Sequence, residues 1–352
     1  MKFSSAINEA IGLSMAKDRS VFVIGEGVPD PKGIFGTTLG LRKKFGASRV
    51  LDMPVSENAL TGVCVGAALR GMRPIITHQR VDFALLAFDQ MINNAAKWHY
   101  MFGGKLSVPL VVRLIVGRGW GQGAQHSQSL QSLFAHIPGL KVVMPATPYD
   151  AKGLLISAVL DNNPVIFIEH RWLHGIEGHV PKGMFRVPIG KAKIVRKGKD
   201  VTVVANSHMT IEALWAASLL EKSGIHIEVI DLRTIKPLDE GTIISSVRKT
   251  GRLIVADESF QSFGITGEII ARVTEKAFRS LKKPPVRVTL PDVPSPSSPY
   301  LTKDFYPGYR EIIKATLEIL GKPKSYLKTV LRHDRAPAKH HDVPDMSFKG
   351  PF

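Results

Sequence analysis

Two side chains suited to binding and activating a small molecule open consecutive helical patterns in this sequence. Glu57 follows Ser56, a residue type favoured at helix N-caps, and its helical pattern stops at Gly71. Phe83 opens the next helical pattern, which continues to Tyr100. A carboxylate can take part in proton chemistry, and an aromatic ring can pack on a flat ligand. The helix dipole also favours a carboxylate in a first turn, so Glu57 alone leaves a structural role open.

His126 is a third candidate. It lies in the polar loop 117–129, which contains four glycines. These glycines do not join a first strand directly to a helix, so they give little support to a dinucleotide site. A long loop beside a sheet more often forms a wall of an active site. On the residues alone, a surface or hydrogen-bonded structural histidine remains an alternative.

The elements that must position these residues alternate between short apolar strands and helical segments. This alternation predicts an α/β protein in which a mostly parallel sheet carries helices on both faces. Ligands bind such sheets at the carboxyl ends of the strands, which is where the candidate residues fall. A second alternation follows a hinge at 190–199. We expect two domains of this kind, 1–188 and 189–320.

Four segments resemble the beta subunit of the thiamine-diphosphate-dependent 2-oxo acid dehydrogenases. They are Val55–Tyr100, Gly121–Leu155, Asp161–Glu169 and Ile227–Ser259. Pyruvate, branched-chain and acetoin dehydrogenases share this subunit, and the resemblance runs in order from about residue 3 to about residue 319. It implies a transketolase-like pyrimidine-binding domain followed by a transketolase C-terminal-like domain. It also implies thiamine diphosphate as cofactor and oxidative decarboxylation of a 2-oxo acid.

The resemblance gives each candidate a role. Glu57 matches the carboxylate that hydrogen-bonds to a ring nitrogen of the cofactor's aminopyrimidine and promotes its imino tautomer. Phe83 matches the aromatic that packs on the pyrimidine face. His126 matches the histidine that faces the substrate, stabilises developing oxyanion charge and assists acyl transfer to a lipoyl group. Gln79 is a weaker candidate for the same pocket.

The sequence lacks the second half of a thiamine site. No Gly-Asp-Gly precedes the Asp-Asn-Asn at 161–163, so the usual Mg²⁺ ligands that anchor the diphosphate are missing. We expect an alpha subunit to hold Mg²⁺ and share the cofactor in an alpha-two beta-two assembly, with a lipoyl-bearing transacylase as a further partner. Two alternatives stay open: a thiamine enzyme half that releases an aldehyde or forms a ketol without a lipoyl partner, and a non-catalytic scaffold subunit.

A structural potassium site is a further expectation from the resemblance. Asp161 and Asn163, with backbone oxygens near Leu110, Ala158 and Val159, match such a site, in which carbonyl dipoles replace the hydration shell. The alternative is a helix C-cap and turn before the strand that begins near residue 165. The residues themselves do not decide between the two.

The chain departs from the family pattern beside the expected pocket. Thr77 stands where an acidic residue is common, and Glu26 is followed by Gly27 rather than Asp. His78 and Arg80 add positive or proton-donating groups. We interpret these last two as a sign of an anionic substrate or of one other than pyruvate.

The formal net charge of +17 raises the question of nucleic-acid binding. Basic residues are mixed with acidic ones through most of the chain and no recognition motif is present, so we expect no nucleic-acid partner. An acidic protein or an anionic substrate explains the charge better. No apolar run approaches the roughly 18 residues needed to span a bilayer. Together with the single cysteine, Cys64, this favours a cytoplasmic protein without membrane or disulfide.

The second domain shows no catalytic pattern. Asp257 and Glu258 end a predicted strand, where helix capping or partner contact is the expected role. From residue 321 the chain is rich in Lys, Pro and His without a sustained period, which predicts a basic tail, 321–352, that docks on a partner. His340 and His341 lack further metal ligands at a suitable spacing.

Overall fold

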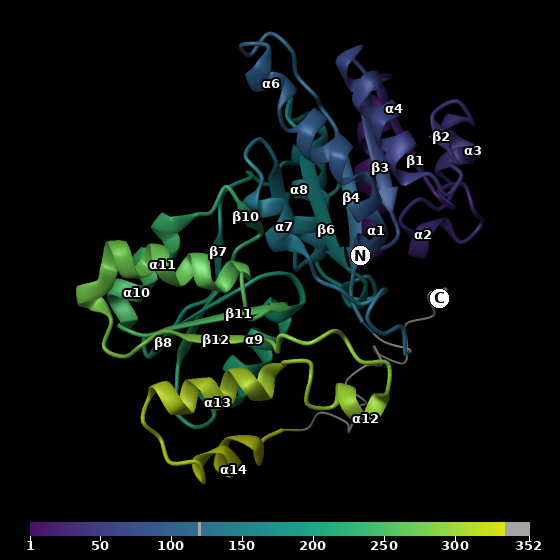
Figure 1. Ribbon diagram of the computed structural model, residues 1–352. Coiled ribbons are helices and arrows are strands. Elements are labelled where there is room, and N and C mark those ends of the chain that lie inside the picture. The colour runs from purple at the N-terminus through teal and green to yellow at the C-terminus, as the bar shows by residue number, and fades with distance from the viewer. Residues whose placement is uncertain (119–120, 335–352) are drawn as a thin grey trace.

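The computed structural model describes residues 1–118 and 121–334, which form two sheets joined along the chain (Figure 1). The first sheet has seven strands in the order β10-β5-β6-β4-β3-β1-β2, all parallel to their neighbours except β10. The strands are β1 (Val21–Gly25), β2 (Val50–Leu51), β3 (Arg73–His78), β4 (Val111–Val116), β5 (Lys141–Val143), β6 (Val165–His170) and β10 (Thr234–Lys236).

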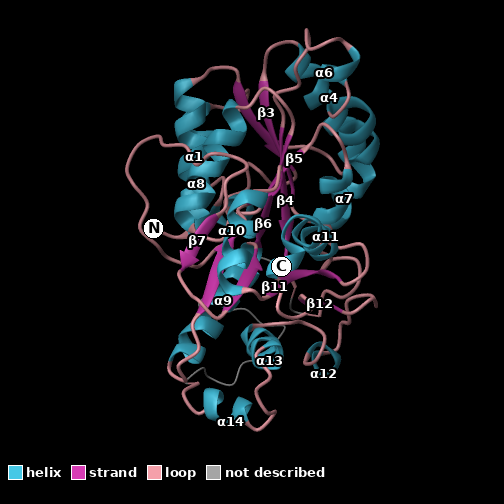
Figure 2. Cartoon of the chain, turned by 90° about the vertical axis from the view of Figure 1, so that its left-hand side faces the viewer, coloured by secondary structure: helices cyan, strands magenta, loops and turns pink. Residues whose placement is uncertain are grey.

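Helices cover both faces of this sheet because its central strands are apolar on both sides. Every residue of β4 and β6 is buried, as expected for parallel strands between two helical layers. One layer contains α1 and α8, and α4 and α7 lie on the opposite face (Figure 2). The helices of this half are α1 (Phe3–Lys17), α2 (Gly33–Gly36), α3 (Leu41–Phe45), α4 (Glu57–Leu69), α5 (Val81–Ala84), α6 (Trp98–Met101), α7 (Gln131–His136) and α8 (Pro148–Leu160).

The helical pattern predicted from Phe83 to Tyr100 is not one regular helix. It is divided into α5, a 3₁₀ turn at Leu85–Ala87, a π-helical turn at Gln90–Ala95, and α6. Ala95 at the end of the π turn and the next residue, Ala96, are both buried in the core of the first half.

The second sheet has five strands in the order β12-β11-β8-β9-β7, and only β7 runs antiparallel. Its strands are β7 (Lys193–Arg196), β8 (Val201–Ala205), β9 (Ile227–Asp231), β11 (Leu253–Phe260) and β12 (Val286–Leu290). The helices are α9 (Ser207–Glu221), α10 (Glu240–Thr250), α11 (Ile265–Ala277), α12 (Pro299–Thr302), α13 (Tyr309–Ile319) and α14 (Tyr326–Leu331). Helices α9 and α13 cover one face, and α10 and α11 pack on the other. The predicted fold class, two mostly parallel sheets with helices on both faces, is confirmed.

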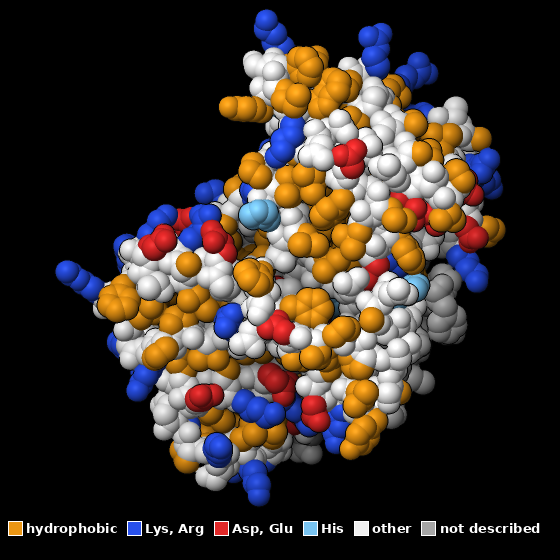
Figure 3. Space-filling model, viewed as in Figure 1, with side chains coloured by type: hydrophobic (Ala, Val, Ile, Leu, Met, Phe, Trp, Pro, Cys, Tyr) orange, Lys and Arg blue, Asp and Glu red, His pale blue; other side chains and the backbone are white. Residues whose placement is uncertain are grey.

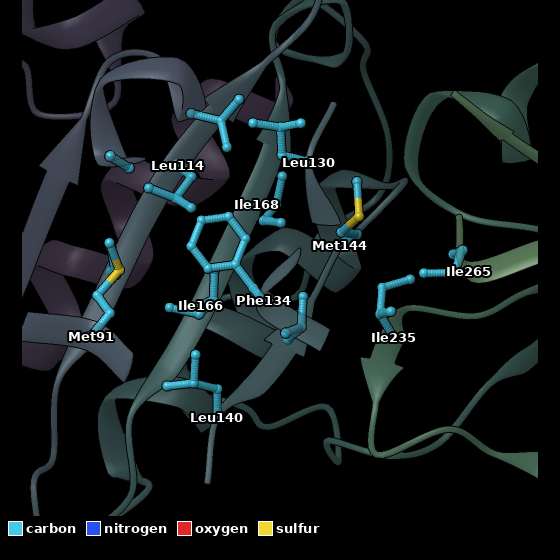
Figure 4. Close-up of a cluster of buried hydrophobic side chains, with 14 of the residues drawn as sticks. Met91, Leu114, Leu130, Phe134, Leu140, Met144, Ile166, Ile168, Ile235 and Ile265 are labelled. Carbon is cyan, nitrogen blue, oxygen red and sulfur yellow. The ribbon is translucent and has the colours of Figure 1, made fainter. Parts of the chain in front are cut away.

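The two halves share a hydrophobic core. Ile235 and Ile265 from the second half join the cluster that contains Phe134 and Met144 from the first (Figure 4). Strand β10 adds an antiparallel edge to the first sheet although it lies among second-half elements in the sequence. The shared core and this crossing strand hold the two sheets against each other. Loops of one half can therefore be held by side chains of the other.

Part of the predicted tail is folded. Val330 in α14 is fully buried, and α14 packs on α13 and α9, the helices that cover one face of the second sheet. Three apolar residues at 327, 330 and 331 share one helical face, which is too short a pattern to stand out in the sequence. The two histidines at 340 and 341 lie outside the described residues. Among the described helices, none is long and apolar enough to cross a membrane.

Candidate active site

A cavity of about 290 Å³ lies at the carboxyl ends of β1 and β3, beside the start of α4. Four sequence-predicted site residues line it together: Glu57, Gln79, Phe83 and His126. The rest of the lining is Glu26, Phe35, Thr77, His78, Arg80 and Gln122. The rule that parallel sheets bind ligands at their carboxyl ends therefore locates this cavity correctly.

Glu57 is a buried carboxylate in the first turn of α4, with 5% of its surface exposed. Among the described residues, none donates a hydrogen bond to its side chain. Ser56 occupies the N-cap position, but its side chain makes no capping bond, contrary to the sequence prediction. A buried carboxylate without a protein donor faces a substantial desolvation cost, which a donor on a bound ligand would offset.

Glu26 and Gln79 form the polar wall beside Glu57. The side-chain amide of Gln79 donates to the backbone carbonyl of Glu26 at 2.6 Å, which joins the end of β3 to the loop after β1. Burial raises the pKa of the Glu26 carboxyl, and the nearby charges of Glu57 and Asp52 raise it further. The sequence marked Glu26 only as a departure from a pattern, whereas the structure places it in the cavity.

Phe83 and His126 form the aromatic part of the lining. Their rings meet edge to face with centroids 5.3 Å apart and planes at 88°. The guanidinium of Arg80 donates through Nη1 to the backbone carbonyl of His126 at 3.2 Å, which fixes the loop at this point. Phe83 keeps 37% of its surface exposed, so the cavity opens to the outside of this chain beside its ring.

The loop that carries His126 is held by the second half of the chain. Arg118 forms an ion pair with Glu258 at the end of β11, and its guanidinium lies between two aromatic rings. The centroid of Trp172 is 4.3 Å away and that of Tyr306 is 4.2 Å away. Ser295 adds a hydrogen bond from its hydroxyl to the carbonyl of Ser127 at 3.5 Å.

Asp257 and Glu258 lie within β11 and cap no described helix, so the expectation of helix capping is wrong, whereas partner contact stays a prediction. Asp257 accepts hydrogen bonds from Gln131 at 2.7 Å and from Asn206 at 2.8 Å, so it also connects the two halves. The available signal was their place at the carboxyl end of β11, the same signal that marked the first-half residues. Because the partners come from distant parts of the sequence, no local pattern revealed the contact.

Two stacked histidines complete this contact between the halves. His170 and His208 lie with ring centroids 4.8 Å apart, and their nitrogens approach the same oxygen of Glu258 at 3.0 and 3.4 Å. Burial lowers the pKa of both, that of His208 to about 3. The backbone N–H of Trp172 donates to Nδ1 of His170, so the proton of the neutral ring lies on Nε2 and points at Glu258. This arrangement fits a hydrogen bond better than a metal ligand.

Comparison with known proteins identifies both halves of the chain. Residues 1–175 match the transketolase pyrimidine-binding domain, and residues 190–312 match the transketolase C-terminal domain. The chain is 49% identical to the beta subunit of an acetoin:2,6-dichlorophenolindophenol oxidoreductase from Cupriavidus necator, over 88% of this chain and 94% of that one. This chain belongs to the beta subunits of the thiamine-dependent dehydrogenases.

Other beta subunits support the same assignment. The acetoin:2,6-dichlorophenolindophenol oxidoreductase subunit of Bacillus subtilis is 45% identical over 92% of this chain and 98% of its own. The mitochondrial pyruvate dehydrogenase E1 beta subunit of Bos taurus is 44% identical over 90% and 89%. A solved split-gene transketolase, described as an inactive beta4 tetramer, has a TM-score of 0.74 at 23% identity over 91% of this chain and 99% of its own, which shows the shared fold.

The unusual residues of this beta subunit differ in their surroundings. Thr77 belongs to a buried network, because Arg113 donates to its hydroxyl at 3.4 Å and forms an ion pair with Glu169. His78 is buried, its Nε2 lies 3.4 Å from the hydroxyl of Thr61, and burial lowers its pKa to about 4. It is therefore neutral near pH 7, which removes the positive charge but not the proton donor from the two alternatives that the sequence left open for it.

The neutral state of His78 predicts a pH effect on stability. Between its ordinary pKa of 6.5 and the folded value of about 4, the unfolded chain takes up a proton that the folded chain does not. The contribution of His78 to the free energy of unfolding should thus be complete above pH 6.5 and decrease as the pH falls. Thermal midpoints at pH 7.5 and 5.5, compared between the wild type and His78→Gln, measure this contribution.

The wild type must be compared with His78→Gln because Asp231 also changes the stability of the protein between pH 7.5 and 5.5. Burial, and then the charge of Asp150, raise the pKa of Asp231 to about 7, so its contribution has the opposite sign over the same range. The His78→Gln variant should lose less stability than the wild type on acidification. An equal loss in both proteins would contradict the assignment of a buried neutral histidine.

The oxygens of the expected potassium site come from the end of α8 and from Leu110, the residue before β4. Arg73 donates through Nη1 to the carbonyls of Val159 at 2.9 Å and Asp161 at 3.0 Å. The Asp161 carboxylate forms an ion pair with Lys141 and accepts from the backbone N–H of Asn163 at 2.9 Å. The carbonyls of Leu110 and Ala158 accept from Val165 and Asp161. Each carbonyl keeps a second lone pair, which a monovalent cation could use. However, the side chains of Arg73 and Lys141 already bring two positive charges to these oxygens.

Proposed function

We propose that this chain is the pyrimidine-binding half of a thiamine-diphosphate-dependent 2-oxo acid dehydrogenase. In this proposal it decarboxylates a 2-oxo acid of pyruvate or branched-chain type and transfers the acyl group to lipoamide, together with an alpha subunit. The observation that carries the proposal is the cavity in which Glu57, buried and without a protein donor, lies beside Phe83 and His126.

The described residues fit the pyrimidine end of the cofactor. Glu57 offers an ionisable oxygen to a ring nitrogen that donates, and Phe83 offers a partly exposed aromatic ring against which a flat heterocycle can pack. Gln79 has its amide nitrogen on Glu26, which leaves the amide oxygen as an acceptor in the cavity. Thiamine diphosphate, when bound, supplies the nucleophilic carbon of the thiazolium ring for attack on the substrate carbonyl.

His126 is the residue of this chain that we assign to the substrate. Its ring contacts Phe83, and its backbone is fixed by Arg80, so the imidazole is held at the cavity wall rather than free on a loop. An imidazole in this position can donate to the oxygen that gains charge at the substrate carbonyl and can return a proton during acyl transfer. Acyl transfer to the lipoyl group of a transacylase belongs to this proposal.

An alpha subunit is required because this chain covers only one side of the cavity. Exposed hydrophobic side chains gather over α4 and the 81–102 segment on the face shown in Figure 3, and such a grouping supports a protein interface there. They include Val63, Phe83, Leu86, Tyr100, Met101 and Phe102. Phe83 belongs both to this surface and to the cavity, so a subunit bound here closes the site and brings the Mg²⁺ ligands that the sequence lacks. An alpha-two beta-two assembly satisfies this requirement.

Co-expression with the alpha subunit tests this division of the cofactor. We expect the isolated chain to show no binding of thiamine diphosphate with Mg²⁺ in titration calorimetry, and the assembled complex to bind it at one site per alpha-beta pair. The reason is that the sequence lacks the Gly-Asp-Gly expected to anchor the diphosphate through Mg²⁺. Binding of the complete coenzyme by the isolated chain, followed by substrate turnover, would refute the shared site.

A second candidate substrate is acetoin, a neutral hydroxy ketone, because two relatives at 49% and 45% identity are named as acetoin oxidoreductase subunits. The same roles of Glu57, Phe83 and His126 apply, since cleavage of the bond next to the carbonyl also needs the cofactor's nucleophilic carbon. The complex is assayed with pyruvate, a branched-chain 2-oxo acid and acetoin, and the highest kcat/KM assigns the substrate.

We also propose a cytoplasmic location.

We further propose that K⁺ binds the oxygens at the end of α8. Potassium chloride is expected to raise the thermal midpoint of the complex above its value in choline chloride at the same ionic strength. A cation bound only to the folded state stabilises it by mass action. Equal midpoints in the two salts would show that Arg73 and Lys141 alone balance these oxygens.

A further inference from the structure

Arg80 is a buried guanidinium that lines the cavity and makes one side-chain hydrogen bond to the described part of the chain. Only 6% of its surface is exposed, and Nη1 donates to the carbonyl of His126 at 3.2 Å. Among residues 1–118 and 121–334, no carboxylate forms an ion pair with it. Asp82, two residues along the chain, accepts from Gln128 at 2.7 Å instead.

Such a group is costly unless an anion joins it. Removing a charge from water costs several kcal/mol, and buried charges in proteins are therefore paired. Burial lowers the pKa of Arg80, and the charge of Asp82 offsets this effect only in part. A guanidinium presents parallel N–H groups that match the two oxygens of a carboxylate, so the missing partner has the chemistry of a carboxylate or a similar anion.

A second guanidinium strengthens the positive side of the cavity. Arg171 donates to the side-chain oxygen of Gln122 at 2.7 Å, and its guanidinium lies 5.4 Å from the ring centroid of Phe35. Both of these partners line the cavity. The pKa of Arg171 is lowered to about 9 by burial and then by the charge of Arg80, which places the two cations near each other. An anion bound at Arg80 would reduce this repulsion.

The carboxylate that leaves in the reaction is a poor partner for Arg80. Its negative charge moves away from that group as the bond to carbon breaks, so a strong ion pair there stabilises the bound substrate more than the transition state. A carboxylate elsewhere on the substrate keeps its charge throughout. Binding that group positions the substrate without opposing decarboxylation.

We propose that Arg80 selects a substrate with a second carboxylate, a dicarboxylic 2-oxo acid. This inference rests on the proposed function, keeps its reaction on a 2-oxo acid, and replaces the pyruvate or branched-chain substrate with a dicarboxylic one. His78, the other positive or proton-donating departure from the family pattern in this segment, takes no part in selecting the substrate. It is buried and neutral, and its ring nitrogen lies at hydrogen-bonding distance from the hydroxyl of Thr61. The rival occupant is an acidic side chain of the alpha subunit, and the experiment separates the two.

The test compares substrates in the assembled alpha-beta complex with thiamine diphosphate and Mg²⁺. Values of kcat/KM are measured for pyruvate, acetoin and two dicarboxylic 2-oxo acids of four and five carbons. We expect a dicarboxylic acid to be preferred by the wild type. In Arg80→Met the ratio of kcat/KM for the dicarboxylic acid to kcat/KM for pyruvate should fall by roughly 10- to 100-fold. This factor corresponds to the loss of a hydrogen bond to a charged group. Arg80→Lys keeps the positive charge but lacks the paired N–H groups of the guanidinium. The ratio in this variant should therefore lie between those of Arg80→Met and the wild type.

Two results would overturn the inference. Either no dicarboxylic acid is preferred by the wild type, or Arg80→Met lowers kcat/KM for all substrates equally, as expected if Arg80 pairs with the alpha subunit or only holds the His126 loop. Glu57→Gln in the same complex separates this outcome from failure of the proposed function. If turnover of pyruvate or acetoin depends on Glu57, the function stands and only the choice of substrate falls. If no turnover depends on Glu57, the function itself fails.

Discussion

Replacing Glu57 with glutamine is expected to lower kcat of the assembled enzyme by roughly 10²- to 10⁴-fold, the usual contribution of a positioned proton-transfer group. Glutamine preserves the shape of the side chain but cannot carry the charge that favours proton transfer at the bound ring. The side chain of Glu57 makes no hydrogen bond to any described residue, so replacing it should leave the fold and the subunit assembly intact. Steady-state kinetics with saturating cofactor, together with sedimentation of the complex, measure both effects.

Glu26→Gln is the matched control. It removes a second carboxylate from the same cavity, one whose pKa is raised by burial and by the charges of Glu57 and Asp52. Its neutralisation should cost far less activity, because it holds Gln79 through its backbone carbonyl rather than its carboxylate. If both variants lost activity equally, Glu57 would not be the specific proton-transfer partner. If Glu57→Gln kept more than a tenth of wild-type kcat, the proposed role would be wrong.

The first-half site could be predicted because its signals are local. Glu57, Gln79 and Phe83 each follow a strand or begin a helix within a few residues, and a parallel sheet brings such positions to one edge. His126 lies farther along the chain, but it belongs to a loop after β4 that must pass the same edge. Their roles in chemistry came from family resemblance, since residue type and spacing alone left structural alternatives open.

The contact between the halves could not be predicted from local patterns. Glu258 meets Arg118 across 140 positions of sequence, and β10 crosses to the first sheet with only three residues. Both depend on how two independently patterned units pack. His78 and Arg80 illustrate a second limit. In the sequence both are departures from the family pattern that could carry a positive charge. In the structure burial keeps His78 neutral, whereas Arg80 remains a cation at the cavity wall.

Breaking the ion pair between Glu258 and Arg118 should lower both the stability of the fold and the turnover of the complex. Glu258→Gln leaves the guanidinium buried between Trp172 and Tyr306 without its carboxylate. Removing one member of a buried pair commonly costs about 3–5 kcal/mol of folding free energy. Urea unfolding of the complex measures this loss, and kcat should fall as well because Arg118 begins the loop that carries His126.

The double variant Arg118→Met with Glu258→Gln distinguishes the ion pair from the packing around it. With both charges removed, no buried charge is left uncompensated, so much of the lost stability should return. Turnover should not return to the same extent, because the loop would still lack the contact that holds it against the second sheet. A double variant as unstable as the sum of the single changes would show that packing on Trp172 and Tyr306, rather than charge, joins the two halves. If Glu258→Gln alone left both stability and kcat unchanged, the second half would have no part in positioning His126.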